Sequence, residues 1–194
     1  MSIRDRVRLR EEKLLSDDHY VLKKVTFDFR RSSGEWQTQT RETYDRGNAV
    51  TLLLYHPAQR TVILTRQFRY PAFVNGLDDL LIETPAGLLE GAAPEERVRA
   101  EAEEEVGYRV HEVHKVFEAY SSPGSVTELV HFFIATYDRD AKQHEGGGLH
   151  AEGEDIEVLE VDIDDALAMI DRGEIKDAKT IMLLQYAALK LFRN

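Results

Sequence analysis

The chain contains no cysteine among its 194 residues, so disulfides, thiolate nucleophiles and cysteine-based zinc sites are excluded. It also lacks any apolar run near the roughly 20 residues that a membrane-spanning helix needs. Its first residues, M-S-I-R-D-R-V-R-L-R-E-E-K, contain no apolar stretch of signal-peptide length. We therefore expect a soluble, cytoplasmic protein with no membrane partner.

Positive charge is scarce as well, since 36 acidic residues against 25 basic ones give a formal net charge of −11. This balance argues against duplex nucleic acid as the main partner, because the phosphate backbone attracts clustered lysine and arginine. No Walker G-x-x-x-x-G-K-[ST] motif is present, which argues against a P-loop NTPase. The length suits one globular domain with an appended element.

Glutamate, by contrast, is concentrated between residues 85 and 108, in the run P-A-G-L-L-E-G-A-A-P-E-E-R-V-R-A-E-A-E-E-E-V-G-Y. Pro94 suits a first helical turn and Gly107 suits a C-terminal stop, so this run predicts a helix. Apolar residues recur at i, i+4 and i+8, which predicts one buried face. The residues of this face are Val98, Ala102 and Val106.

Glu101, Glu104 and Glu105 lie beside this apolar face, within roughly 100° of the helix circumference. Carboxylates at this spacing repel one another, and partial burial increases the cost. A solvated acidic helix face is the alternative interpretation. The position at the edge of the core favours a bound divalent cation instead, Mg²⁺ or alternatively Mn²⁺, held through oxygen ligands.

At these residues the chain resembles the Nudix hydrolases, whose signature is G-x5-E-x7-R-E-U-x-E-E-x-G-U with U aliphatic. The segment E-A-E-E-E-V-G-Y matches the second half of the signature. Three positions depart from it. Gly87 lies one residue too close to the glutamates, and the position of the first signature glutamate falls at Ala92 or Ala93. Ala100 occupies the position of the signature arginine. Arg97, one turn before Glu101, is the candidate to replace that arginine, whereas Arg99 points to the other flank.

Further segments resemble the GDP-mannose pyrophosphatase branch, which is close to the ADP-ribose pyrophosphatases, and branch members share the short spacing after P-A-G. The segments are Y-D-R-G-N (44–48), R-Q-F-R (66–69), P-A-G-L-L (85–89), S-P-G-S-V-T-E (122–128), E-D-I-E-V-L-E (154–160) and D-A-K-T (177–180). The resemblance implies an α+β protein, the α/β/α sandwich of the Nudix fold with a mixed sheet. An N-terminal antiparallel β extension (1–48) would precede the Nudix domain (49–194).

The hydrophobic pattern predicts most elements of this fold. Strands are expected at 19–29 and 36–44 as a hairpin, at 49–55 and 61–66 as a second hairpin, and near 109–119, 128–137 and 156–162. Two helices are expected at the end of the chain, one from Ile163 to a stop at Gly173 and one from Thr180 to Phe192.

The resemblance also implies a metal site formed by the backbone carbonyl of Ala86 with the carboxylates of Glu101 and Glu105. Glu104 would be a further ligand or would support one. Glu154, at the end of the glycine-rich loop 141–155, would complete metal binding and act as general base, with Glu152 as the other candidate base. A flexible loop could close a carboxylate over a bound diphosphate, although a disordered surface loop has the same composition.

Substrate contacts carried over from the branch are spread along the chain. Arg69 would bind phosphate oxygens bidentately, or it forms only a surface ion pair. Lys179 lies before the last predicted helix and would meet a phosphate or sugar, or is simply solvated. The remaining substrate-binding candidates are His19, Tyr20, Arg41, Glu42, Ala86, Gly87 and Glu128.

The function implied is Mg²⁺-dependent hydrolysis of a nucleotide sugar, GDP-mannose giving GMP and mannose 1-phosphate. An ADP-ribose pyrophosphatase, giving AMP and ribose 5-phosphate, is the close alternative. Ala100 motivates a third hypothesis, a catalytically inactive domain that senses nucleotide sugars. The resemblance also implies a homodimer in which the N-terminal sheet crosses to the other subunit; alternatively the hairpin extends the sheet of its own subunit.

Overall fold

The structure, a computed structural model, describes residues 2–192, except for the side chain of Glu152. The chain forms two compact units. The N-terminal unit combines Met1–Asn48 with Tyr120–Leu129, and the second unit combines Ala49–Ala119 with Val130–Asn194. The described part contains no helix that is both long enough and apolar enough to cross a membrane.

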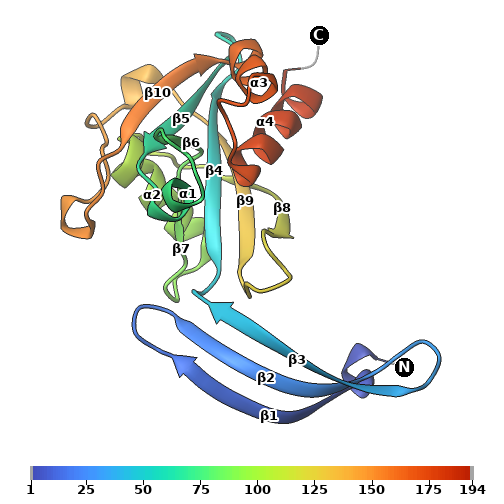
Figure 1. Cartoon of the computed structure of the whole chain (residues 1–194). Coiled ribbons are helices and arrows are strands. Elements are labelled where there is room, and N and C mark those ends of the chain that lie inside the picture. The colour runs from blue at the N-terminus through green and yellow to red at the C-terminus, as the bar shows by residue number, and fades with distance from the viewer. Residues whose placement is uncertain (1, 193–194) are drawn as a thin grey trace. The chain divides into compact units, whose positions relative to one another are not determined.

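The N-terminal unit is a three-stranded antiparallel sheet in the order β1-β2-β3 (Figure 1). A 3₁₀ turn, η1 (Ile3–Arg6), precedes β1 (Val7–Ser16), β2 (Val21–Arg30) and β3 (Trp36–Asp45). The expected hairpin is therefore confirmed as β2 and β3. Strand β1 was not predicted, because every one of its residues is exposed and the period-2 alternation of its sequence, V-R-L-R-E-E-K-L-L-S, does not continue beyond the first four residues.

The second unit is built on a mixed sheet whose main strands follow the order β10-β5-β4-β9-β8. Strand β4 runs parallel to β9 and antiparallel to β5, while β6 and β7 attach to β5 and β4. The strands are β4 (Ala49–His56), β5 (Thr61–Gln67), β6 (Leu81–Glu83), β7 (Ala86–Leu88), β8 (His114–Tyr120), β9 (Leu129–Thr136) and β10 (Glu157–Asp162).

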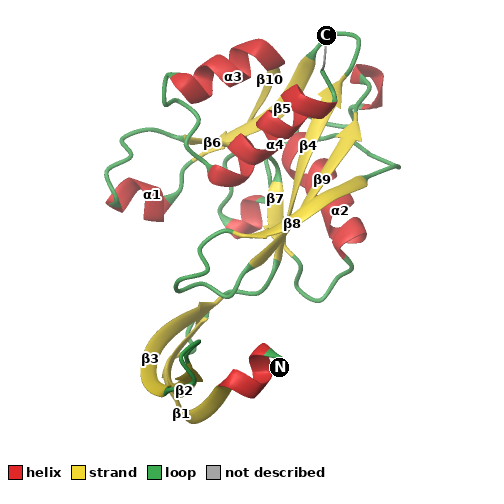
Figure 2. Ribbon diagram, turned by 90° about the vertical axis from the view of Figure 1, so that its right-hand side faces the viewer, coloured by secondary structure: helices red, strands yellow, loops and turns green. Residues whose placement is uncertain are grey.

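Helices cover both faces of this sheet, with α2 behind it and α4 in front in Figure 2. The helices are α1 (Tyr70–Val74), α2 (Pro94–Val106), α3 (Ile163–Asp171) and α4 (Ala178–Lys190). One buried cluster joins the sheet to α2 and a second joins it to α3 and α4. The expected α+β fold with an α/β/α sandwich is therefore confirmed.

Strand β4 shows why the sheet is central. Its first six residues, A-V-T-L-L-L, are all buried, because helices cover both faces and the strand reads as a nearly continuous apolar run. Successive side chains of a strand point to opposite faces of the sheet, so the side chains of β4 are divided between the two faces. Val50, Leu52 and Leu54 pack on the α2 side, and Ala49 and Leu53 pack on the α3–α4 side.

The remaining differences between the expected and the observed elements concern the ends of elements or elements of only a few residues. Strand β8 begins at His114 instead of about 109, because Tyr108 leaves α2 and forms an isolated bridge with Lys142. Helix α4 begins two residues early, at Ala178, behind an Asp177 cap. Helix α1 and strands β6 and β7 have five or fewer residues each, too few for a periodic pattern.

Candidate active site

Helix α2 carries two buried carboxylates, Glu101 at 3% exposure and Glu105 at 2%. Pro94 lies at the start of the helix, and Gly107 ends it in the left-handed conformation at φ 76°. The apolar face predicted from the sequence is fully buried, which fixes the rotation of the helix. Glu105 consequently reaches β7, where its Oε2 accepts the backbone N–H of Ala86 at 3.1 Å.

Gly87 in β7 leaves room for the second carboxylate. A Cβ at this position would lie 1.6 Å from Oε1 of Glu101, which no real side chain could tolerate. The backbone of the P-A-G segment and the carboxylate of Glu101 therefore approach each other only because residue 87 is glycine.

Arg97 supplies the positive charge nearest to these acids. Its Nη2 lies 2.5 Å from Oε1 of Glu101, and its Nη1 lies 3.5 Å from Oε2 of Glu104, which is partly exposed. Its Nε also donates to the carbonyl of Leu88 at 3.0 Å, which ties α2 to β7. Arg99, in contrast, donates to the backbone carbonyls of His111 and Glu95. Arg97 thus holds a glutamate of the signature, as expected for the residue that replaces the arginine lost at Ala100.

The pKa of Glu105 lies well above its ordinary value. Burial is the largest cause, and the neighbouring charge of Glu101 adds to it. The N–H of Ala86 and the charge of Arg69 act in the opposite direction, while Glu154 raises the pKa further. The same balance shows that Glu154 and Arg69 both act electrostatically on Glu105.

The glycine-rich loop is anchored to the end of α2. The N–H groups of Gln143, Gly147 and Gly148 donate to the carbonyls of Gly107, Glu105 and Glu104 at 2.7, 2.9 and 3.1 Å. These carbonyls belong to the last turn, which has no intrahelical donors. Beyond this anchor, Oε2 of Glu154 accepts the N–H of Leu149 at 2.8 Å.

Gly148 has a left-handed backbone at φ 77°, and a Cβ there would lie 2.4 Å from Oε2 of Glu154. The loop glycine is therefore required by the position of the Glu154 carboxylate. The side chain of Glu152, the other candidate base, lies outside the described part of the structure.

A second group of charges lies at Glu83, which the sequence did not single out. Its carboxylate accepts Nε of Arg69 at 2.7 Å and Nζ of Lys179 at 2.5 Å. Lys179 also bonds Asp177, the residue that caps α4, at 2.9 Å. The segments R-Q-F-R and D-A-K-T, distant in the sequence, therefore meet at one carboxylate.

Behind these charges runs a chain of buried threonines. Thr180 donates to Asp177 at 2.6 Å and accepts the backbone N–H of Thr84 at 2.7 Å. Thr84 and Thr51 share a hydrogen bond at 2.8 Å, and Thr51 donates to the carbonyl of Pro85 at 3.1 Å. This chain connects the start of α4 to the P-A-G segment. No sequence pattern predicts this chain of hydrogen bonds, because the three threonines lie far apart in the sequence.

The donor set of α2 suits a hard divalent cation. Glu101 and Glu105 are buried carboxylates that disfavour each other's charge, and oxygen ligands of this kind are those that Mg²⁺ and Mn²⁺ prefer. Within residues 2–192, however, no three acidic or histidine side chains already converge as a ready-made metal cluster. Arg97 holds Glu101 and Leu149 holds Glu154, so complete coordination would require these side chains to rearrange.

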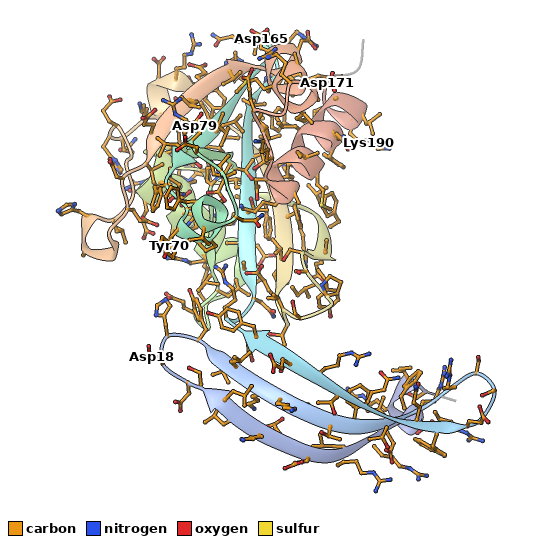
Figure 3. The ribbon with its side chains drawn as sticks, viewed as in Figure 1. Asp18, Tyr70, Asp79, Asp165, Asp171 and Lys190 are labelled. Carbon is orange, nitrogen blue, oxygen red and sulfur yellow. The ribbon has the colours of Figure 1, made fainter. Side chains whose placement is uncertain are left out.

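The other expected substrate residues lie in the N-terminal unit. Tyr20 packs against His19 with ring centroids 4.3 Å apart, in the turn that follows Asp18 (labelled in Figure 3). The guanidinium of Arg46 lies 5.6 Å from the ring centre of Tyr20 and 3.3 Å from Glu128. The adjacent strand residues Arg41 and Glu42 are both exposed, and the guanidinium of Arg41 donates to Thr40 and Gln39 of its own strand.

Comparison with known proteins assigns the chain to a family. The NUDIX domain model matches residues 45–184, and the model described as the GDP-mannose pyrophosphatase NudK N-terminal domain matches residues 6–44. The chain belongs to the Nudix family and is an enzyme of the hydrolase class. The resemblance read from the signature is thereby confirmed.

The names of individual relatives are more specific than the name of the family. A GDP-mannose pyrophosphatase of Pectobacterium atrosepticum is 54% identical over 181 residues, covering 93% of each chain. That of Citrobacter koseri is 51% identical over 182 residues, covering 93% of this chain and 94% of the relative. A crystal structure of an ADP compounds hydrolase has the same fold, with a TM-score of 0.70 at 15% identity over 92% of this chain and 90% of that one.

Proposed function

We propose that the protein hydrolyses the diphosphate bond of GDP-mannose to GMP and mannose 1-phosphate in the presence of Mg²⁺. The observation that carries the proposal is the 54% identity, over 93% of the chain, to a relative named GDP-mannose pyrophosphatase. The two buried carboxylates of α2 support it, because a hard divalent cation prefers oxygen ligands of this kind.

The charges of the second unit suit a diphosphate that binds together with a divalent cation. Glu101 and Glu104 share one cation, Arg97, and Glu105 adds a third acid, so these carboxylates would repel a diphosphate without a bound cation. A bound Mg²⁺ withdraws charge from the diphosphate and lowers the pKa of bound water. Glu101 and Glu105, together with the Ala86 carbonyl, are the residues we propose to hold it, supported by Glu104 and Glu154.

The protein groups would then act as follows. Arg69 and Lys179 bind phosphate oxygens, since each keeps donors besides those that bond Glu83. Glu154 accepts a proton from the attacking water, whose oxygen forms a new bond to phosphorus. The P–O–P bridge breaks, and the leaving phosphate retains the bridging oxygen. Glu154 suits this role because it lies on a loop and acts on Glu105 electrostatically.

In the N-terminal unit, we propose that Tyr20, with His19 beside it, provides an aromatic surface for the nucleotide. Arg41, Glu42 and Glu128 would add hydrogen bonds. Aromatic rings stack on nucleobases, and a carboxylate accepts from the N–H groups of guanine. Arg46 holds Glu128 at 3.3 Å, and Ser121 donates to Glu128 at 3.0 Å, so this carboxylate has a defined position.

The test is a hydrolysis assay with and without Mg²⁺ over GDP-mannose, GDP-glucose, ADP-ribose, ADP-glucose and NADH. We expect the highest kcat/KM with GDP-mannose and no turnover after chelation. A preference for ADP-ribose, with AMP and ribose 5-phosphate as products, would replace the proposed substrate. Binding of these compounds without turnover of any would instead identify the catalytically inactive sensor.

A further inference from the structure

Glu83 is a buried carboxylate that lies behind two partly exposed cations. The side chain of Glu83 is 5% exposed, while those of Arg69 and Lys179 are 39% and 21% exposed. Each oxygen binds one cation, Oε2 binding Arg69 and Oε1 binding Lys179. The carboxylate therefore sets the distance between two positive groups that reach the surface.

The backbone around this group is fixed on both sides. Glu83 ends β6, where it pairs with Thr65 of β5, and Thr65 also donates its hydroxyl to the Glu83 carbonyl at 3.2 Å. Lys179 lies in the first turn of α4, which Asp177 caps through the N–H of Thr180 at 2.9 Å. Glu83 and Lys179 thus lie in regular elements, and Arg69 is the residue that immediately precedes α1.

Both cations keep donors that could bind an anion. Arg69 donates Nε to Glu83, and its two terminal nitrogens bond none of the residues that the structure describes. Lys179 has three N–H donors, of which Glu83 and Asp177 take two. Arg69 also interacts electrostatically with Glu105 and Glu154, two of the acids assigned to the proposed metal site.

In this group, each charged residue stabilises the charged form of its partners. Burial alone would raise the pKa of Glu83, but Lys179 and Arg69 keep it below its ordinary value. Burial also opposes the charge of Lys179, and Glu83 with Asp177 raises its pKa above the ordinary value. A buried ion pair is weak grounds for assigning a role in stability, because desolvation offsets much of the attraction.

We propose that Glu83 is a positioning residue that holds Arg69 and Lys179 together as a two-cation receptor for one phosphate of the substrate. This inference deepens the proposed function and rests on it for the identity of the anion as part of a nucleoside diphosphate. Glu83 itself does not touch the substrate. It orients the Arg69 fork and keeps Lys179 protonated, so that both reach the same phosphate group.

The test compares wild type with Glu83→Gln, which keeps the size of the side chain and removes its charge. Two measurements are made on each full-length protein: the pKa of Lys179 from the ¹³Cε shift by NMR, and the affinity for inorganic pyrophosphate by calorimetry with and without Mg²⁺. Glu160→Gln is the matched control, because Glu160 also binds an arginine and a hydroxyl but lies in the Tyr137–Arg139 group.

We expect Glu83→Gln to lower the Lys179 pKa and to weaken pyrophosphate binding about tenfold or more, because charge-assisted contacts are the strong ones. The control should change neither value. If Glu83→Gln leaves both values unchanged, or if wild type binds no pyrophosphate in either buffer, the proposal is wrong. A Lys179 pKa below its ordinary value of about 10.4 in wild type would also contradict it.

Should Glu83→Gln fail to fold, Glu83→Asp provides the second measurement. Its carboxylate keeps the charge but is one methylene too short to reach both cations, so pyrophosphate affinity should fall while the fold is retained. A pyrophosphate affinity equal to that of wild type would contradict the proposed two-cation receptor. None of these readouts requires turnover, so a wild type that fails to hydrolyse GDP-mannose would refute the proposed function and leave this result standing.

Discussion

Glu105 is the acid on which the proposed metal site depends most, and its ionisation should control stability as well as activity. In the folded protein its pKa is raised by burial and by Glu101, so between the unfolded and the folded pKa it holds a proton that the unfolded chain has already released. Stability must then fall as pH rises from the unfolded value, about 4.3, through the folded one. We expect the Tm of metal-free wild type to decrease over this interval more than that of Glu105→Gln, measured by calorimetry.

Adding Mg²⁺ above the folded pKa should raise the Tm of wild type and leave that of Glu105→Gln nearly unchanged, because a ligand that binds only the folded state stabilises it. The variant should also have no measurable turnover. Glu103→Gln is the control on the same helix, since Glu103 pairs with Arg109 at the surface. Turnover of Glu105→Gln at the wild-type rate would remove Glu105 from the site.

Arg97 should matter far more than its neighbour Arg99. It contacts Glu101, Glu104 and the carbonyl of Leu88, so Arg97→Met would leave a buried carboxylate without its cation. We expect kcat to fall by roughly 10² or more, since misplacing a catalytic group by about 1 Å has that effect. Arg99→Met removes only contacts to backbone carbonyls and should leave kcat within about twofold.

Restoring the arginine of the Nudix signature provides a sharper test. In the double variant Arg97→Met with Ala100→Arg, a guanidinium returns directly beside Glu101 in the sequence. We expect steady-state kinetics to recover part of the lost kcat. If Arg97→Met is as active as wild type, Arg97 does not replace the signature arginine.

At the scale of single residues, the sequence predicted those positions that follow from the geometry of one helix. The rotation of α2 placed Glu101 and Glu105 at the edge of the core, and one turn of spacing brought Arg97 to Glu101. Glu83 escaped prediction for the opposite reason: its partner Lys179 is 96 residues away, and nothing local marks a carboxylate that the fold will bury.

The glycine-rich loop is the element that brings the proposed base to the site, and its two glycines can be separated by experiment. Gly147 and Gly148 both have left-handed backbones, at φ 113° and 77°. A Cβ on Gly147 meets nothing within 4 Å, whereas a Cβ on Gly148 would lie 2.4 Å from the Glu154 carboxylate. Gly147→Ala therefore reports backbone strain alone, and Gly148→Ala adds displacement of Glu154.

We expect Gly148→Ala to lower kcat at least about tenfold more than Gly147→Ala, because only the former moves the proposed general base. Steady-state kinetics gives the comparison, and hydrogen exchange at the amides that bond α2 reports whether the anchor survives. Equal kcat values for the two variants would contradict the assignment of Glu154 as base.

Element prediction succeeded where a pattern was long enough to read. The buried run of β4, the hairpin β2–β3 and the helix ended by Gly107 were all expected from the sequence. The three-residue strands β6 and β7 were not, although they carry Glu83, Ala86 and Gly87. The hydrophobic pattern thus predicted the long helix of the proposed site, the family resemblance supplied Ala86 and Gly87, and Glu83 was missed.

On the scale of the whole molecule, the N-terminal sheet lacks a core of its own. Across β1 to β3, all of whose residues the structure describes, Asp28 is the single buried side chain, and it bonds Arg10 and Thr38. Large apolar side chains instead remain exposed, among them Leu9 at 64% and Leu14 at 51%. Among the described residues, β1, β2 and β3 pair only with one another and with no strand of the seven-stranded sheet.

A small sheet without a buried apolar face is marginal in water, so it requires another surface to cover it. A second copy of the chain meets this need, and we predict that the intact protein sediments as a dimer whereas a chain lacking residues 1–45 sediments as a monomer. Circular dichroism should verify that the truncated chain keeps the helices of the second unit. A stable homodimer would bury more than about 1,000 Å², so the dimer should persist on dilution to micromolar protein. A monomer in both cases would show that the exposed leucines are not covered by a second subunit.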